Sequence, residues 1–347
     1  MAAEIRQQFL NLPRALRETV EKGRPEYEQL VRRTRWGEVP IHLVGSGPSF
    51  AVGLAGAYAF ESLLGWPVVA RTPEEFQAYS QSGLRPRSIL FVISWKGSAE
   101  LVELVRAAKA RGATVLALTS NAQSPLAKAV DGVFLARGGE EPREDCTAGV
   151  CQLAAVHCLA GVAAQVLKRP SPQIEALEGE LRTLPEHIEW ALTQLPDAVR
   201  SMAGELSGRR AVSVVAGGLY YPAALLGASA LRNLGRMRAQ VFTPDEMDAR
   251  PTEALELGEV VLVLSGSRCA LKKRLHGLVE RLKRAGVRIL AVTDHNEPEV
   301  TRCATLAVLL PNLSEYVGSI VALTFLDWAA YHLACQRSRK QTRSGGA

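Results

Sequence analysis

The chain has 347 residues, of which 47% are apolar and 22% are charged, which is the composition of an ordinary globular protein and more chain than one typical domain needs. The formal net charge is +6, but no basic stripe interleaved with aromatic residues runs through the sequence. We therefore expect no nucleic-acid partner, whereas a mildly basic protein suits an anionic small molecule.

No run of 18 uninterrupted apolar residues occurs, so the sequence predicts no membrane span. Glu4 and Arg6 stand where a signal peptide would need an apolar run. The six cysteines form no CxxC pair, which is typical of neutral thiols in a reducing cytoplasm. We accordingly expect no metal site and no cofactor.

Residues 1–34 are predicted to form a leading helical segment, broken near Pro13 and again at 23–25. Beyond it, the strand-like run IHLV is followed by GSGPS at 45–49, and the run ILFVI is followed by SWKGS at 94–98 and a helix. Continuous Val, Ile and Leu strands that alternate with helices indicate a parallel sheet covered on both faces.

The same order of elements occurs twice along the chain. Gly47 and Ser94 are 47 positions apart, and so are Gly218 and Ser265, with an offset of about 171 positions between the copies. We therefore predict an α/β protein of two tandem doubly wound, flavodoxin-like parallel-sheet domains. The predicted boundaries are an N-terminal helical segment at 1–34, a first domain at 35–168, a helical connector at 169–207, a second domain at 208–336 and a disordered tail at 337–347.

In an open parallel sheet, ligands bind at the carboxyl ends of the strands, where GSGPS and SWKGS both fall. Free N–H groups at helix starts favour an anion, serine hydroxyls add donors, and a lysine adds a positive charge. The alternative is that these residues only cap helices, form turns or face solvent. The predicted phosphate- and sugar-binding residues in these turns are Gly47, Ser49, Ser94, Lys96, Gly97 and Ser98.

Longer motifs extend beyond the two turns, among them FESLLGWPVVARTPEEF at 60–76, GGLYYPAALLGASALRNLG at 217–235 and PNLSEYVGSI at 311–320. With them the chain resembles tandem sugar-isomerase (SIS) proteins over nearly its whole length, such as the isomerase half of glucosamine-6-phosphate synthase and stand-alone phosphosugar isomerases and deaminases. The resemblance implies a phosphosugar-binding protein that acts on an (amino)sugar phosphate as an aldose–ketose isomerase or deaminase. It also implies a cytoplasmic homodimer.

Carried over position by position, Ser49 and Ser94 match the phosphate-binding serines of the family, and Thr147 matches a threonine at a helix start. The positions at which the family has its catalytic residues depart further from the family pattern. Where the resemblance implies a lysine, a glutamate and a histidine, this chain has Ala230, Asn233 and Ala249.

Proton transfer between two sugar carbons needs a base, which asparagine and alanine cannot supply. Glu141 matches a family glutamate ahead of Thr147, and Glu246 and Asp248 lie in the loop that replaces the histidine loop. We predict these three carboxylates as candidate catalytic bases. Glu141 could instead cap a helix or face solvent, and Glu246 and Asp248 could belong to a solvated acidic loop. The lost lysine, glutamate and histidine positions favour the alternative that the chain is a non-catalytic sensor of a sugar phosphate.

Overall fold

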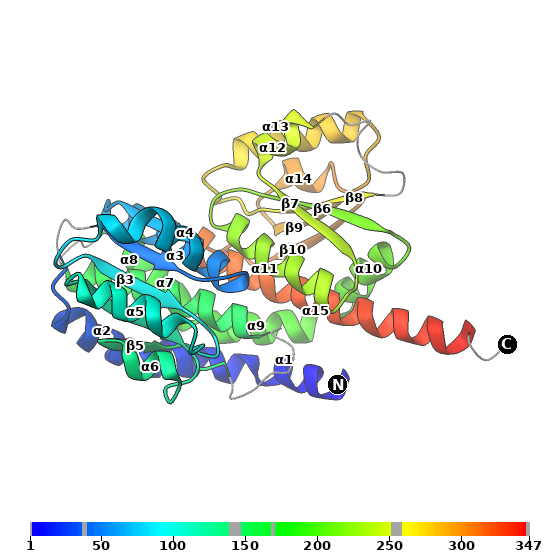
Figure 1. The fold of residues 1–347 in the computed structure, drawn as a ribbon. Coiled ribbons are helices and arrows are strands. Elements are labelled where there is room, and N and C mark those ends of the chain that lie inside the picture. The colour runs from blue at the N-terminus through cyan, green and yellow to red at the C-terminus, as the bar shows by residue number, and fades with distance from the viewer. Residues whose placement is uncertain (1, 37–39, 139–146, 168–170, 251–258, 345–347) are drawn as a thin grey trace. The chain divides into compact units, whose positions relative to one another are not determined.

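The computed structural model describes residues 2–36, 40–138, 147–167, 171–250 and 259–344. The chain divides into two compact units, one of residues 11–185 and one of residues 1–10 with 186–347. Each unit contains a five-stranded parallel sheet with flanking helices, which can be followed in Figure 1. The prediction of two tandem doubly wound α/β domains is therefore confirmed.

The first sheet has the strand order β2-β1-β3-β4-β5, and every neighbouring pair is parallel. Both its faces are covered, which explains why β3 is apolar and buried at every position. The strands are β1 (Ile41–Val44), β2 (Val68–Arg71), β3 (Ile89–Ile93), β4 (Thr114–Thr119) and β5 (Gly132–Leu135).

Alternate side chains of β3 show which helices cover which face. Leu90 and Val92 pack in a buried cluster with Leu104 of α5, whereas the ring of Phe91 lies 5.9 Å from that of Phe60 in α3. The helices of this unit are α2 (Gly23–Arg33), α3 (Pro48–Leu64), the short α4 (Pro73–Glu75), α5 (Leu101–Ala110), α6 (Pro125–Ala129), α7 (Ala148–Val166) and α8 (Pro172–Arg182).

The second sheet repeats this topology, with the order β10-β9-β8-β6-β7 and parallel pairs throughout. Its strands are β6 (Ala211–Ala216), β7 (Arg238–Phe242), β8 (Val260–Leu264), β9 (Ile289–Asp294) and β10 (Leu306–Leu310). The remaining helices are α9 (Leu184–Gln194), α10 (Pro196–Ser207), α11 (Tyr220–Asn233), α12 (Pro244–Ala249), α13 (Lys272–Arg284), α14 (Pro298–Thr301) and α15 (Glu315–Ser344).

The N-terminal segment differs from the prediction of a break near Pro13. Helix α1 (Ala2–Arg17) continues through that proline, and the irregular turn is instead a π-helical stretch at Glu18–Lys22, directly before α2. A proline removes one backbone hydrogen bond from a helix. Here Leu12 and Leu16 beside it are fully buried, and their packing holds the helix together.

The C-terminal segment also differs from the sequence prediction, because α15 continues to Ser344 where a disordered tail from 337 was expected. Arg337 donates hydrogen bonds to the carbonyl oxygens of Gly235 (2.6 Å), Arg236 (2.8 Å) and Arg209 (3.3 Å). These bonds anchor the helix beyond its apolar part. Residues that lie far apart in the sequence supply the anchor, so local composition could not reveal it.

Helices α7 and α15 have the length and apolar composition of membrane spans. In the structure, however, 83% and 89% of their apolar windows are buried inside the protein. Their apolar residues therefore serve as domain core.

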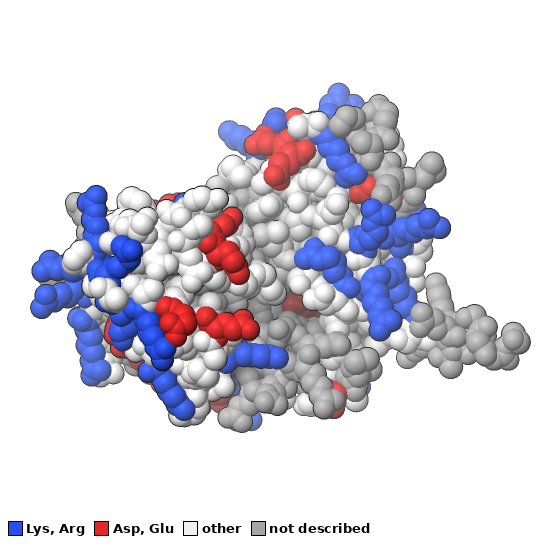
Figure 2. All heavy atoms as spheres, viewed as in Figure 1, with Lys and Arg blue, Asp and Glu red and all other residues white. Residues whose placement is uncertain are grey.

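Figure 2 shows acidic side chains among the basic ones on the visible face of both units.

We predict that the stability of this core depends on pH through Asp327 of α15. The side chain is 4% exposed, and burial raises its carboxyl pKa well above the ordinary value. The folded chain therefore keeps a proton that the unfolded chain releases, and stability falls as the pH rises from about 4 towards the raised pKa. Asp327→Asn, which imitates the protonated acid, should unfold at a higher temperature than the wild type at pH 8, by about 2 °C or more.

At pH 4 the two proteins should melt at similar temperatures in a calorimetric scan. Asp294 is a matched control, because it is equally buried but accepts hydrogen bonds from Ser267 N (2.7 Å), Ser267 Oγ (3.0 Å) and Asn296 N (2.8 Å). Asp294→Asn should therefore lower the melting temperature. A lower melting temperature for Asp327→Asn at pH 8 would contradict the prediction.

Candidate functional site

The strand order of the first sheet reverses between β1 and β3, and this is where a doubly wound sheet opens a crevice for ligands. Strand β1 pairs with β2 on one side and with β3 on the other, and Val44 is aligned with Val92. The turns that follow the two strands therefore leave the sheet at the same edge and level. They contain the GSGPS and SWKGS motifs.

The turn after β1 is built around two glycines. A Cβ atom at Gly45 would lie 2.7 Å from the backbone of Ser49, so the chain passes too closely for a side chain. Gly47 has φ +53°, a conformation that favours glycine, and Pro48 begins α3 directly after it. These features place the half-buried Ser49 in the first turn of α3.

The turn after β3 is held by its own serines. Ser94 Oγ accepts from the amide of Ser98 (3.4 Å), and the Ser94 carbonyl oxygen accepts from the amide of Gly97 (3.3 Å). The amides of Lys96 and Ala99 make no hydrogen bond to any described residue. They are available as donors beside the exposed Lys96 side chain.

Neighbouring segments fix the position of this second turn. The Trp95 carbonyl oxygen accepts from Thr119 Oγ1 (2.9 Å) and from the amide of Ser120 (3.2 Å), both at the end of β4. The Gly97 carbonyl oxygen accepts from the amide of Leu126 (3.3 Å). Strand β4 and helix α6 thus fix the position of the turn.

One further predicted residue lies at the start of α7. Thr147 is the N-terminal cap residue of this helix and is 2% exposed, and its carbonyl oxygen accepts from the amide of Cys151 (3.1 Å). Its side chain makes no capping hydrogen bond. Glu141 lies outside the described residues.

The carboxylate of Glu246 has a structural partner. Glu246 and Thr243 form a capping box at the start of α12, in which Thr243 N donates to Glu246 Oε2 (2.7 Å) and Glu246 N donates to Thr243 Oγ1 (3.2 Å). Thr72 and Glu75 form the same box in the first repeat, 171 positions earlier. The sequence signal for this role was present as TPEE and TPDE but was missed.

Asp248 is likewise engaged in ion pairs. Its carboxylate oxygens lie 2.7 Å from Arg281 Nε and 3.0 Å from an Arg274 nitrogen, both in α13. These pairs and the Arg274–Asp245 pair fasten α12 to α13. Whether Glu246 or Asp248 also moves a proton stays a prediction.

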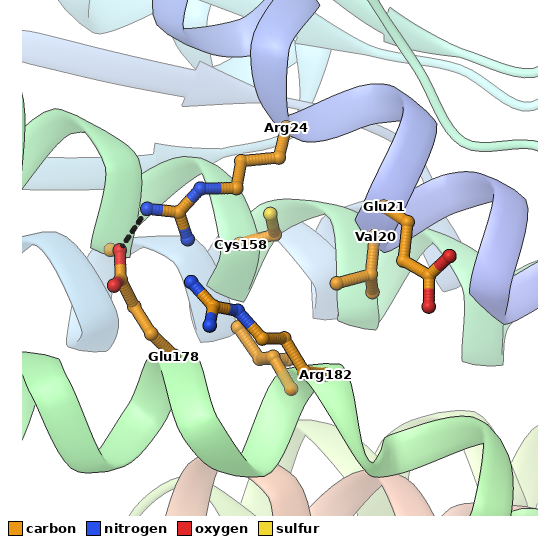
Figure 3. A pocket seen from close by; sticks show the side chains of 8 residues that line it. Val20, Glu21, Arg24, Cys158, Glu178 and Arg182 are labelled. Carbon is orange, nitrogen blue, oxygen red and sulfur yellow. Dashed lines mark hydrogen bonds and ion pairs between the residues drawn. The ribbon is translucent and has the colours of Figure 1, made fainter.

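A cavity of about 290 Å³ lies elsewhere in the first unit, among the helices and away from the strand ends (Figure 3). The guanidinium groups of Arg24 and Arg182 extend into it beside Cys158. The same Arg24 nitrogen donates to Glu178 and to Gln165, each at 2.6 Å. Because Glu178 pairs with Arg24 and Glu21 also lines the cavity, its two cations face two carboxylates, and it is a weaker place for a phosphate than the turns at the switch point.

Metal-ligating side chains approach one another in the second unit, where atoms of His276, Glu297 and Glu299 lie within 4.8 Å of one another. His276 Nε2 is 2.6 Å from Glu297 Oε2, so a hydrogen bond already accounts for this pair. In the first unit, burial raises the pKa of Cys151 and of Cys158 to about 12, which keeps both thiols neutral. The expectation that the chain holds no metal stays a prediction.

We predict that the two turns differ in their tolerance of a side chain. Gly97 has φ +67°, and a Cβ there would lie 2.0 Å from Ser124 Oγ, whereas a Cβ at Gly47 would meet no described atom within 4 Å. Gly97→Ala should therefore lower the free energy of unfolding by more than Gly47→Ala, which carries only the conformational strain of about 1–2 kcal/mol. Urea denaturation of the two variants measures the difference.

Removing the obstructing side chain provides the control for this prediction. Ser124→Gly alone should cost stability, because Ser124 Oγ accepts from the amide of Ala127 (3.1 Å) and caps α6. In the double variant Gly97→Ala with Ser124→Gly, the alanine should lower the free energy of unfolding, relative to Ser124→Gly alone, by no more than Gly47→Ala lowers it in the wild type. Strictly additive costs would refute the steric explanation.

Comparison with known proteins adds to this geometry. The curated relatives include the isomerizing glutamine–fructose-6-phosphate aminotransferases of Thermococcus kodakarensis, with 27% identity over 94% of this chain, and of Rhizobium leguminosarum, with 27% identity over 86%. These matches cover 54% and 49% of the relatives, so the chain spans about half of their length.

Solved structures share the fold over nearly the whole chain. The C-terminal domain of glucosamine-fructose-6-phosphate aminotransferase from Francisella tularensis superposes with a TM-score of 0.84 at 19% identity, over 95% of both chains. Tagatose-6-phosphate ketose/aldose isomerase from Escherichia coli gives 0.76 at 16% identity, over 97% of this chain and 95% of that one. The SIS domain model matches residues 38–161 and 205–333, and the chain therefore belongs to the SIS domain family, with one copy of the domain in each repeat.

Proposed function

We propose that the chain binds a phosphosugar at the switch point of its first repeat. The observation that carries this proposal is the pair of turns after β1 and β3, at one edge of the sheet. They offer the hydroxyl groups of Ser49, Ser94 and Ser98, two amides without a described partner, and the cation of Lys96. A phosphate needs such convergent donors and positive charge. Gly47, Gly97 and Thr147 complete the proposed site.

The substrate class follows from the names of the relatives. Fructose 6-phosphate and tagatose 6-phosphate occur in those names. Glucosamine 6-phosphate occurs in the name of another solved structure of this fold, a deaminase from Thermotoga maritima with a TM-score of 0.70 at 16% identity, and all three are six-carbon sugars with a terminal phosphate. We propose that this chain takes a ligand of that class, as an aldose–ketose isomerase or as an amino-sugar phosphate deaminase. The proposal includes a cytoplasmic homodimer.

Either reaction needs a base to move a proton next to the sugar carbonyl group. Among the proposed candidates, Glu246 is held in a capping box and Asp248 in ion pairs with two arginines. Glu141 is therefore the first candidate. The same engagement of Glu246 and Asp248 favours a second candidate function, a sensor that binds the sugar phosphate without converting it.

We predict that binding depends on the serines of the first repeat. A hydrogen bond to a charged group contributes about 1.5–3 kcal/mol, so Ser94→Ala should weaken the binding of fructose 6-phosphate or glucosamine 6-phosphate roughly 10- to 100-fold. Lys96→Ala should weaken binding too, with an effect that shrinks as salt is added. Isothermal titration calorimetry measures both effects.

The equivalent serine of the second repeat is the matched control. Ser265 is buried and shares a hydrogen bond with Thr293 at 3.2 Å. Ser265→Ala should leave the affinity unchanged. Equal losses of affinity in Ser94→Ala and Ser265→Ala would contradict the proposed location, and no binding of either sugar phosphate to the wild type would refute the proposal for those ligands.

Turnover separates the enzyme from the sensor. If the chain is an isomerase or deaminase, we expect Glu141→Gln to abolish product formation, because an amide cannot accept the proton at neutral pH. Glu246→Gln preserves the capping box and should lower the rate no more than Glu75→Gln, its counterpart in the first repeat. Chromatographic product analysis after incubation with each sugar phosphate gives the rates.

Two other outcomes would change the assignment. A large loss of turnover in Glu246→Gln, with a melting temperature like that of Glu75→Gln, would make Glu246 the base. Binding of a sugar phosphate without product from the wild type would favour the sensor.

A further inference from the structure

The second repeat has its own switch point, between β6 and β8. Strand β6 pairs with β7 on one side and with β8 on the other, and Ala216 is aligned with Leu264. The turns that follow these strands lead into α11 and α13. Backbone amides of these turns therefore face the same kind of crevice as in the first repeat.

The carboxylate of Glu315 occupies this crevice. Its Oε1 accepts from the amide of Leu219 (3.0 Å), and its Oε2 accepts from the amide of Ala270 (3.3 Å). Leu219 is the N-terminal cap residue of α11, and Ala270 stands two residues before α13. One carboxylate thus accepts hydrogen bonds at both helix starts, the contacts that an anionic ligand would make there.

The glycine in the turn after the first strand shows how closely the two repeats correspond. Gly47 and Gly218 are 171 positions apart and have nearly the same conformation, with φ +53° and +56°. A Cβ at Gly218 would lie 2.0 Å from Glu315 Oε1, whereas a Cβ at Gly47 would meet no described atom within 4 Å. The space above the glycine is filled by a carboxylate in the second repeat, and no described residue fills it in the first.

Glu315 is held mostly out of solvent. Burial raises the pKa of its carboxyl group, while hydrogen bonds from Leu219, the Cys269 thiol and Ala270 oppose that rise. Cys269 itself is only 5% exposed. The carboxylate is therefore a built-in occupant of the crevice.

We propose that Glu315 is an internal anion in the position where a ligand phosphate would bind to the second repeat. The wild-type chain then binds a single phosphate ester, in its first repeat, and loss of the Glu315 carboxylate opens a second anion site. The count of one in the wild type rests on the proposed function, whereas the opening of a new site does not.

The test compares Glu315→Ala with the wild type. Titration with fructose 6-phosphate, and separately with inorganic phosphate, should give one site per chain for the wild type and two for Glu315→Ala. Glu315→Gln is the matched control, because it fills the space with an isosteric side chain and should add no site. Adding Ser94→Ala to Glu315→Ala should weaken one of the two sites and leave the other unchanged.

The outcomes distinguish this inference from the proposed function. One site in both proteins would overturn the internal-anion proposal and leave the function intact. No site in the wild type and one site in Glu315→Ala would overturn the proposed function and leave the internal-anion proposal intact. If Glu315→Ala does not fold in plain buffer, sulfate should restore its folding where chloride at equal ionic strength does not, and failure of that rescue would also overturn the proposal.

Discussion

Backbone amides at the ends of adjacent parallel strands impose the main constraint on this molecule. The parallel ladders place β1 beside β3 and β6 beside β8, so the turns after each pair meet at one edge of their sheet. Amides removed from water need an acceptor, and those at helix starts favour a negative one. The second repeat meets this need with its own carboxylate, from Glu315. In the first repeat, Lys96 and Ala99 are exposed and their amides have no such partner among the described residues, so water can serve as acceptor until an anion binds.

Local sequence patterns were sufficient to predict the fold. The apolar runs at 41–44 and 89–93 are strands, and their buried faces follow from the continuous Val, Ile and Leu pattern. The glycines at equal spacing mark equal turns, as the nearly identical φ angles of Gly47 and Gly218 show. The capping boxes also have a local sequence signal, because threonine, proline and glutamate recur at the starts of α4 and α12. This repeated pattern by itself predicts that Glu246 caps α12.

Long-range partners explain what the sequence could not reveal. Glu315 is separated by 96 positions from Leu219 and by 45 from Ala270, and nothing in the motif SEYV indicates that its carboxylate lies between two helix starts. The extension of α15 likewise depends on Arg337, which reaches carbonyl oxygens more than 100 positions away. Such contacts exist only once the sheet has brought distant turns together. A residue's type and its neighbours therefore predicted an anion-binding edge without predicting which anion fills it.

Covalent attachment explains why two repeats with one topology can differ in function. An anion on a side chain is always present at a high effective concentration, so it holds the starts of α11, α13 and α15 together permanently. A soluble phosphate must lose translational freedom to occupy the same kind of crevice, and it can leave again. A repeat that has to exchange its ligand needs donors without a permanent partner, which makes it less rigid when empty. A repeat with a tethered carboxylate is more rigid, but it cannot exchange that anion for a ligand. On this reasoning, the second repeat is the more rigid of the two, and the first is the repeat in which the proposed sugar phosphate could exchange.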